Sequence, residues 1–162
     1  ADGYDGTLTY IGQSDQASQT QAVTVQAMLE AAGFTVKTDL LRNIADQTNR
    51  IYVTHDYDIA VSAMSIPDED PYSRLATNML SQSPQNPSGY ANPEMDDLIN
   101  QLQAAEGDAA TKLLTQINEL WQETVPGVAM GAGAFFMPWN EDVHGVTYTS
   151  ETILLLGGAW KG

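Results

Sequence analysis

The first 66 residues alternate strand-like and helix-like segments, and this order constrains the fold more than any other feature of the chain. The patterning predicts strands at 7–11, 34–41 and 58–66, with helices at about 19–32 and 44–55 between them. Parallel neighbouring strands need a crossover of about a dozen residues or more, and both helical segments are long enough to supply one. We therefore expect an α/β fold with a mainly parallel sheet flanked by helices.

Two glycines mark boundaries in this region. Gly12 is expected to end the first strand, and Gly33 is expected to end the first helix in a left-handed conformation. An apolar stripe with helical spacing is expected to face the sheet, and it comprises Val25, Met28, Leu29 and Ala32.

Helices dominate the second half of the expected fold. A short helix is predicted from Asp70-Pro71 to about Leu80, followed by a hairpin of helices at 93–105 and 109–124. In the hairpin, Gly107 is expected to end the first helix and Asp108 to cap the second. A strand is predicted at 128–137, and short strands or an extended tail at 142–149 and 153–156. The residues expected to face inward in the hairpin are Met95, Leu98, Ile99, Leu102, Leu113, Leu114, Ile117, Leu120 and Trp121.

Composition limits the partners that the chain can have. Its 162 residues suffice for a single domain, and 43% of them are hydrophobic. Six basic residues against 21 acidic ones give a net charge of −15, which argues against nucleic acid and anionic membranes as partners. Cysteine is absent, which excludes disulfides, thiolate metal sites and a catalytic thiol. No apolar run approaches the roughly 20 residues of a membrane span, and no export signal opens the sequence.

Few residues favour a metal site or catalysis. Asp68-Glu69-Asp70 invites a calcium loop, but the Gly and Glu that an EF-hand needs at its sixth and twelfth positions are replaced by Ser73 and Met79. We predict neither a metal nor a cofactor, and no enzymatic activity. Two alternatives stay open, namely a small α/β hydrolase-like enzyme using an acidic pair and an interaction domain without a ligand.

The segment that follows the third predicted strand is the predicted ligand-binding region. Ligand crevices in open α/β sheets form just beyond the carboxyl ends of the strands. This segment combines apolar side chains with carboxylates, which suits a ligand that carries an amine or another cation. The residues predicted to contact ligand are Met64, Ser65, Ile66, Asp68, Asp70, Asn86 and Tyr90.

Four short motifs in a fixed order carry a family resemblance. They are Tyr57-Asp58-Ile59-Ala60-Val61, Asp70-Pro71, Ser88-Gly89-Tyr90-Ala91-Asn92-Pro93-Glu94-Met95-Asp96 and Val125-Pro126. This series resembles the C-terminal part of the extracellular solute-binding proteins of the peptide/nickel ABC transporter type, solute-binding protein family 5. The match extends from about Gly6 to Trp160.

The resemblance implies a periplasmic-binding-protein-like lobe. Residues 1–162 would form a single domain, the C-terminal lobe of a larger two-lobed protein whose N-terminal part, with its export signal, is absent here. The function implied is to capture a peptide or other small solute between two lobes for import. The implied partners are that solute and an ABC transporter permease. The implied location is extracytoplasmic, with membrane association only through a lipid anchor outside this segment.

The chain departs from the family pattern at the expected amine anchor. Family members carry a Gly-Trp-x-x-Asp motif whose Asp can pair with the α-amine of a peptide. Aligned on the Asp-Pro pair, this sequence has Met64 at the Trp position and Pro67 at the Asp position, with Asp68 next to it. Gly131 and Ala132 occupy the positions of larger aromatic or His residues, which implies a roomier pocket.

Overall fold

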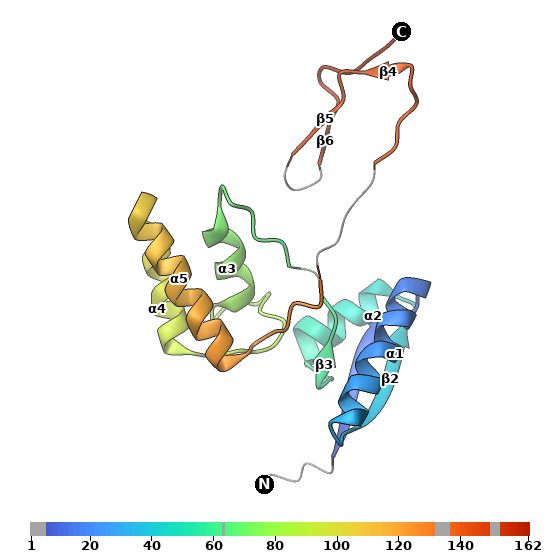
Figure 1. Ribbon diagram of the computed structural model, residues 1–162, viewed down its shortest axis with the longest axis vertical. Helices are drawn as coiled ribbons and strands as arrows, with labels where there is room; N and C mark the ends of the chain where they lie inside the picture. Colours follow the sequence, from blue (N-terminus) through green and yellow to red (C-terminus); the bar gives the residue numbers. More distant parts are fainter. Residues whose placement is uncertain (1–5, 63, 132–136, 150–152) are drawn as a thin grey trace.

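A three-stranded parallel sheet forms the first unit of the molecule, as Figure 1 shows. The computed structural model describes residues 6–62, 64–131, 137–149 and 153–162. Strand β1 (Thr7–Gln13) lies between β2 (Thr35–Leu41) and β3 (Ile59–Ala60), so the order is β2-β1-β3. The crossovers are α1 (Gln16–Ala31) and α2 (Ile44–Asn49), the latter continued by a π-helical turn, η1 (Arg50–Thr54). The expected α/β fold is thereby confirmed.

Two strand boundaries differ from the expectation. β1 continues through Gly12, because β2 stays beside it and pairs Leu40 with that glycine. β3 is much shorter than the expected 58–66, since only Tyr10 and Ile11 of β1 pair with it. After one further hydrogen bond, from the Val61 N–H to the Ile11 carbonyl, no strand partner follows among the described residues. Apolar, β-branched composition permits a strand, but a neighbouring backbone decides its length.

Helix α1 covers the sheet through a narrower stripe than expected. Ala22 is buried with Tyr10 and Val36, and Val25 and Leu29 pack against that cluster as predicted. Met28 is 63% exposed, so its predicted place in the core is wrong. It lies about 100° around the helix from Leu29, on the solvent side. Ala32, the C-cap, is also exposed, whereas the expected left-handed Gly33 is confirmed by a φ of +97°.

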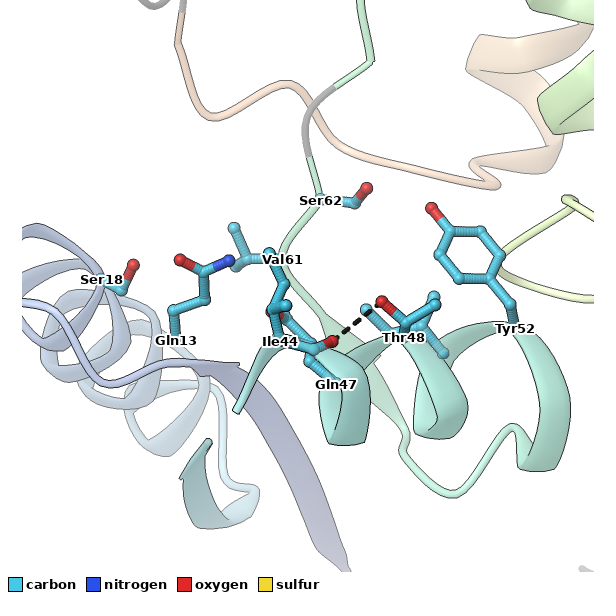
Figure 2. A pocket seen from close by; sticks show the side chains of 9 residues that line it. Gln13, Ser18, Ile44, Gln47, Thr48, Tyr52, Val61 and Ser62 are labelled. Carbon is cyan, nitrogen blue, oxygen red and sulfur yellow. Dashed lines mark hydrogen bonds between the residues drawn. The ribbon is translucent and has the colours of Figure 1, made fainter. Parts of the chain in front are cut away.

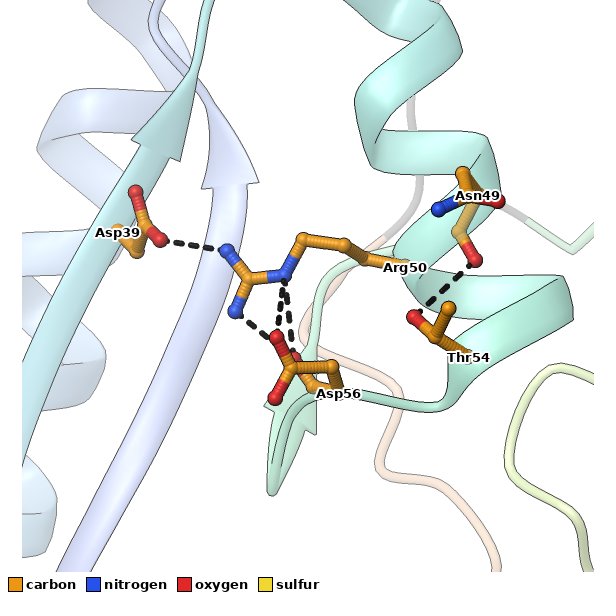
Figure 3. Close-up of polar contacts among 5 residues, drawn as sticks. All are labelled: Asp39, Asn49, Arg50, Thr54 and Asp56. Carbon is orange, nitrogen blue, oxygen red and sulfur yellow. Dashed lines mark hydrogen bonds and ion pairs between the residues drawn. The ribbon is translucent and has the colours of Figure 1, made fainter.

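Arg50 ties the π-helical turn to the sheet (Figure 3). Its Nη1 donates to Asp39 Oδ2 on β2, while Nε and Nη2 both donate to the Asp56 carbonyl, at 3.1 and 2.8 Å. The guanidinium fork bridges two segments that are distant in sequence, a geometry that lysine could not reproduce. Because η1 also carries buried Ile51 and half-buried Tyr52, this contact fixes where those two side chains point.

Three helices form the second unit, which Figure 1 shows beside the sheet. They are α3 (Pro71–Met79), α4 (Pro93–Leu102) and α5 (Gly107–Thr124). α4 packs against both of the others. Asn92 caps α4, as its position before Pro93 predicts, by accepting from the Glu94 and Met95 N–H groups. The buried residues shared by these helices are Leu75, Met79, Met95, Leu98, Ile99, Leu102, Ile117 and Leu120.

The predicted turn between α4 and α5 is wrong in detail. α4 ends at Leu102 rather than Ala105, and Gly107 begins α5 instead of ending α4. Asp108 therefore lies inside the first turn, where its charge suits the positive helix end, and Glu106 holds the N-cap position without a side-chain cap bond. Of the inward residues expected on α5, Ile117 and Leu120 are buried, whereas Leu113, Leu114 and Trp121 are only partly buried against the same core.

The last segment contains two small antiparallel ladders. β4 (Val143–His144) pairs with β7 (Trp160–Lys161), and β5 (Thr147–Tyr148) pairs with β6 (Leu154–Leu155). Within the expected ranges 142–149 and 153–156, strand structure is limited to these two-residue segments, and β7 was not predicted. The strand expected at 128–137 is absent from residues 128–131 and 137, and its remainder, 132–136, lies outside the described residues. No helix in the described ranges combines the length and apolarity needed to cross a bilayer.

Candidate functional site

An open hollow of about 320 Å³ lies at the carboxyl ends of the parallel strands (Figure 2). Gln13 is the last residue of β1, while Val61 and Ser62 directly follow β3. α1 contributes Ser18, and the rest of the wall comes from α2 and η1. The lining consists of Gln13, Ser18, Ile44, Gln47, Thr48, Ile51, Tyr52, Val61 and Ser62. Open parallel sheets bind their ligands at this edge.

The lining carries no formal charge at neutral pH, although the chain as a whole is strongly acidic. Asp15, whose carboxylate bonds the lining residue Ser18, is engaged as the cap of α1. Its Oδ1 accepts from the Ala17 and Ser18 N–H groups, both at 3.0 Å, and its Oδ2 accepts from the Ser18 hydroxyl. The hydrogen bond from the Ser18 side chain is the largest of the effects that lower the pKa of Asp15. Two of the N–H groups at this helix end, those of Ala17 and Ser18, are thus satisfied by a carboxylate.

Gln47 is the unusual residue of the hollow. It is only 8% exposed, yet its side-chain amide makes no hydrogen bond to any residue that the structure describes. Its backbone N–H is bonded to the Asn43 carbonyl within the helix. Asn86, the other buried polar residue among those described, has its amide fully engaged. A buried amide without partners is uncommon and destabilising, so it calls for a physical explanation.

The predicted ligand-binding segment leads away from this hollow and does not line it. Met64, Ser65, Ile66 and Asp68 are all exposed, with Met64 at 39% and Ile66 at 43%. They follow Ser62, so they continue from its rim along the chain. Asp70 instead borders a second, more open depression of about 700 Å³. That depression is lined by Pro67, Glu69, Asp70, Ser73, Arg74, Thr77 and Thr149.

Asp70 is the N-cap of α3, as its position before Pro71 predicts. Its Oδ1 accepts from the Ser73 N–H at 3.1 Å, and its Oδ2 accepts from the Ser73 hydroxyl at 2.5 Å. Of these, the bond from the Ser73 side chain does most to lower the pKa of Asp70 below its usual value of 3.8. Asp68, two residues earlier, makes no hydrogen bond to any other described residue.

Replacing Asp70 with alanine should lower the melting temperature at pH 7 by about 2–4 °C, because two bonds to the first turn of α3 are lost. A carboxyl whose pKa falls on folding stabilises the protein above its unfolded pKa and loses that effect as the pH falls through the folded value. The difference between wild type and Asp70→Ala should therefore shrink below about pH 3.8. Thermal melts from pH 7 to pH 3 measure it. Asp68→Ala is the matched control, and an equal loss in that variant would contradict the assignment.

Asn86 and Tyr90 are held within the loop that connects α3 to α4. The Asn86 amide donates to the carbonyls of Tyr90 and Leu80, at 2.7 and 3.3 Å. The Tyr90 hydroxyl bonds Thr124 Oγ1 at 2.9 Å. The carbonyl of Pro87, in the same loop, accepts from the Tyr57 hydroxyl and lies 3.3 Å from Nδ1 of His55. The loop thus joins the sheet unit to the helical unit, and neither Asn86 nor Tyr90 lines either cavity.

Sequence reasoning missed the residues of α2 and η1 that line the hollow. The signal was present, because Ile44, Gln47, Thr48 and Ile51 follow the spacing of a single helix face. Their partly polar character hides that face from a search for apolar stripes. Within the described ranges, no group of three or more His, Cys, Asp or Glu side chains is placed to hold a metal ion.

Known structures share this arrangement of elements. The structure of the pheromone receptor PrgZ superposes on 98% of the chain with a TM-score of 0.76 and 17% identity, over 30% of its own length. An oligopeptide ABC transporter substrate-binding domain from Bacillus anthracis matches 96% of the chain with a TM-score of 0.71 and 17% identity, over 31% of its length. OppA from Haemophilus influenzae, solved with the peptide RPPGFSPFR, matches 74% with a TM-score of 0.62 and 20% identity, over 24% of its length. No protein-family model matches the chain, and no curated protein is significantly similar to it.

These likenesses define the class of fold. The chain has the periplasmic-binding-protein-like α/β fold of these three structures. It spans less than a third of the length of each of these three solved chains. All three are binding proteins by their descriptions.

Proposed function

We propose that the chain is the C-terminal lobe of a family 5 solute-binding protein that captures a peptide-like solute for an ABC importer. The observation that carries this proposal is the hollow at the carboxyl edge of the parallel sheet, in a fold shared with peptide-binding proteins. The open side of the hollow suits closure by a second lobe, because a ligand-binding cleft usually buries most of its ligand.

Within this proposal, the hollow and the segment that follows it serve two parts of one ligand. Met64 and Ile66 offer exposed apolar surface, and Ser65 adds a hydroxyl beside them. The Asp68 carboxylate, which has no hydrogen-bond partner among the described residues, is the proposed anchor for an amine. The other predicted residues have a positioning role, because each is engaged in a helix cap or a loop. They are Asp70, Asn86 and Tyr90.

The proposal places the protein outside the cytoplasm. The murein tripeptide-binding protein MppA, which matches 74% of the chain with a TM-score of 0.65, is described as periplasmic. A permease of the ABC type is the proposed partner, and a lipid anchor in another part of the full-length protein would hold it at the membrane. The net charge of −15 fits this location, because a large net charge keeps a peripheral protein soluble.

Native mass spectrometry with an equimolar pool of tripeptides tests the proposal. The full-length protein is expected to retain one or more peptides at micromolar concentration. Residues 1–162 alone should retain none, because half of a cleft forfeits most of the buried ligand surface. Sub-micromolar binding by the isolated 162-residue chain would contradict the two-lobed cleft. A full-length protein that retains no peptide would contradict the choice of solute.

A further inference from the structure

We propose that the hollow at the carboxyl edge of the sheet is a subsite for an uncharged carboxamide, and that Gln47 determines this specificity. The inference rests on the proposed solute-binding function and adds the chemistry of the group that is bound. A carboxamide is found both in the peptide bond and in the side chains of asparagine and glutamine, so either part of a peptide can supply it.

The first argument is the unsatisfied amide of Gln47. A carboxamide has two N–H donors and one oxygen that accepts two hydrogen bonds. Gln47 as a whole is only 8% exposed, and its amide meets no hydrogen-bond partner among the described residues. Because such a group destabilises the ligand-free protein, the group that completes its hydrogen bonds is best supplied by the ligand.

The second argument is the composition of the wall. Gln13, at the end of β1, carries a second carboxamide, and Ser62 adds a hydroxyl that points toward the side of Tyr52 (Figure 2). Neither side chain forms a hydrogen bond with another described residue. The apolar part of the wall consists of Ile44, Ile51, Val61 and the Tyr52 ring. Donors and acceptors therefore stand together beside apolar surface.

This composition selects against charged groups. A carboxylate or an ammonium group in the hollow would lose water and find no opposite charge in the lining. A purely apolar group would leave the Gln47 amide unpaired in the complex as well. A carboxamide avoids both penalties, because it offers donors and acceptors at once, as Gln47 itself does.

Calorimetry on the full-length protein with Ala-Gln-Ala, Ala-Glu-Ala and Ala-Met-Ala tests the inference. These peptides differ only in the central side chain, whose size is nearly constant. Glutamine is neutral and polar, glutamate is charged, and methionine is apolar. Wild type is expected to bind Ala-Gln-Ala about tenfold more tightly than the other two if the hollow takes a side chain. The variant Gln47→Met should then bind Ala-Gln-Ala and Ala-Met-Ala alike. If the hollow takes a peptide bond, Gln47→Met should weaken all three about tenfold. Either result supports the carboxamide subsite.

Two controls separate this role from a structural one. Gln101 lies exposed on α4 outside both cavities, so Gln101→Met should leave all three affinities unchanged. The melting temperature of ligand-free Gln47→Met should rise, because a buried group without partners is replaced by an apolar one of similar size. A lower melting temperature would show that Gln47 is satisfied in the folded protein, and it would overturn the inference.

The remaining outcomes also distinguish the two proposals. If wild type and Gln47→Met bind the three peptides with the same affinities, the carboxamide subsite is refuted while the solute-binding function stands. If no peptide binds to the wild-type protein, both proposals fail together.

Discussion

Replacing Ile99 with alanine is expected to lower the free energy of unfolding by about 2–5 kcal/mol. Ile99 lies on α4 with 0% of its surface exposed, in the core that α3, α4 and α5 share. The substitution removes three carbon atoms from a site enclosed on all sides, so it loses hydrophobic transfer energy and leaves a cavity. Urea denaturation followed by circular dichroism measures the change.

Ile44→Ala is the matched control for this prediction. Ile44 is also a helical isoleucine, at the start of α2, but it is 70% exposed. Its replacement should change the free energy of unfolding by less than about 1 kcal/mol. Equal losses in the two variants would mean that the packing of α4 differs from the structure described above.

Truncating Trp121 to alanine should cost about 2–3 kcal/mol, less than the roughly 3–5 kcal/mol of a fully enclosed tryptophan. The ring is only partly buried against the helical core, so a smaller apolar area is lost. Its Nε1 donates to the Gly127 carbonyl at 2.9 Å, which ties the segment after α5 back onto the helix. Trp121→Phe keeps most of the apolar contact and removes this bond.

The two Trp121 variants separate packing from hydrogen bonding. We expect Trp121→Phe to retain more than half of the stability that Trp121→Ala loses, because a single neutral hydrogen bond contributes about 1 kcal/mol. If Trp121→Ala costs less than about 1 kcal/mol, the ring does not contact the core. Denaturant unfolding of the three proteins decides between these results.

Local rules were sufficient at three helix ends. Asp70 and Asn92, each followed by proline, cap α3 and α4, and Gly33 takes the left-handed conformation after α1. These features depend on the backbone within three residues, so the sequence specifies them. The turn at Gly107 failed because glycine suits either side of a helix boundary, and only the packing of α5 on α4 selects one.

The rule for parallel sheets pointed to the carboxyl edge of the sheet, where the hollow lies, but none of the residues predicted to contact ligand lines that hollow. The rule for parallel sheets directs attention to the residues after β3, and the hollow does include Val61 and Ser62. Most of its wall comes from Gln13, Ser18 and one face of α2 and η1, which no short motif connects. The expected residues Asn86 and Tyr90 belong instead to a loop held by its own hydrogen bonds.

By itself, the sequence determined the alternation of strands and helices in the first 66 residues, the parallel sheet, and the caps of α3 and α4, because periodicity and capping are properties of short segments. The tertiary structure alone decided how long β3 could be, which face of α1 met the sheet, and which side chains converged on the hollow. Each of these depends on atoms from segments that are distant along the chain. The burial of Gln47 is of the same kind, because only the packed structure places this residue in the interior without giving its amide a partner among the described residues.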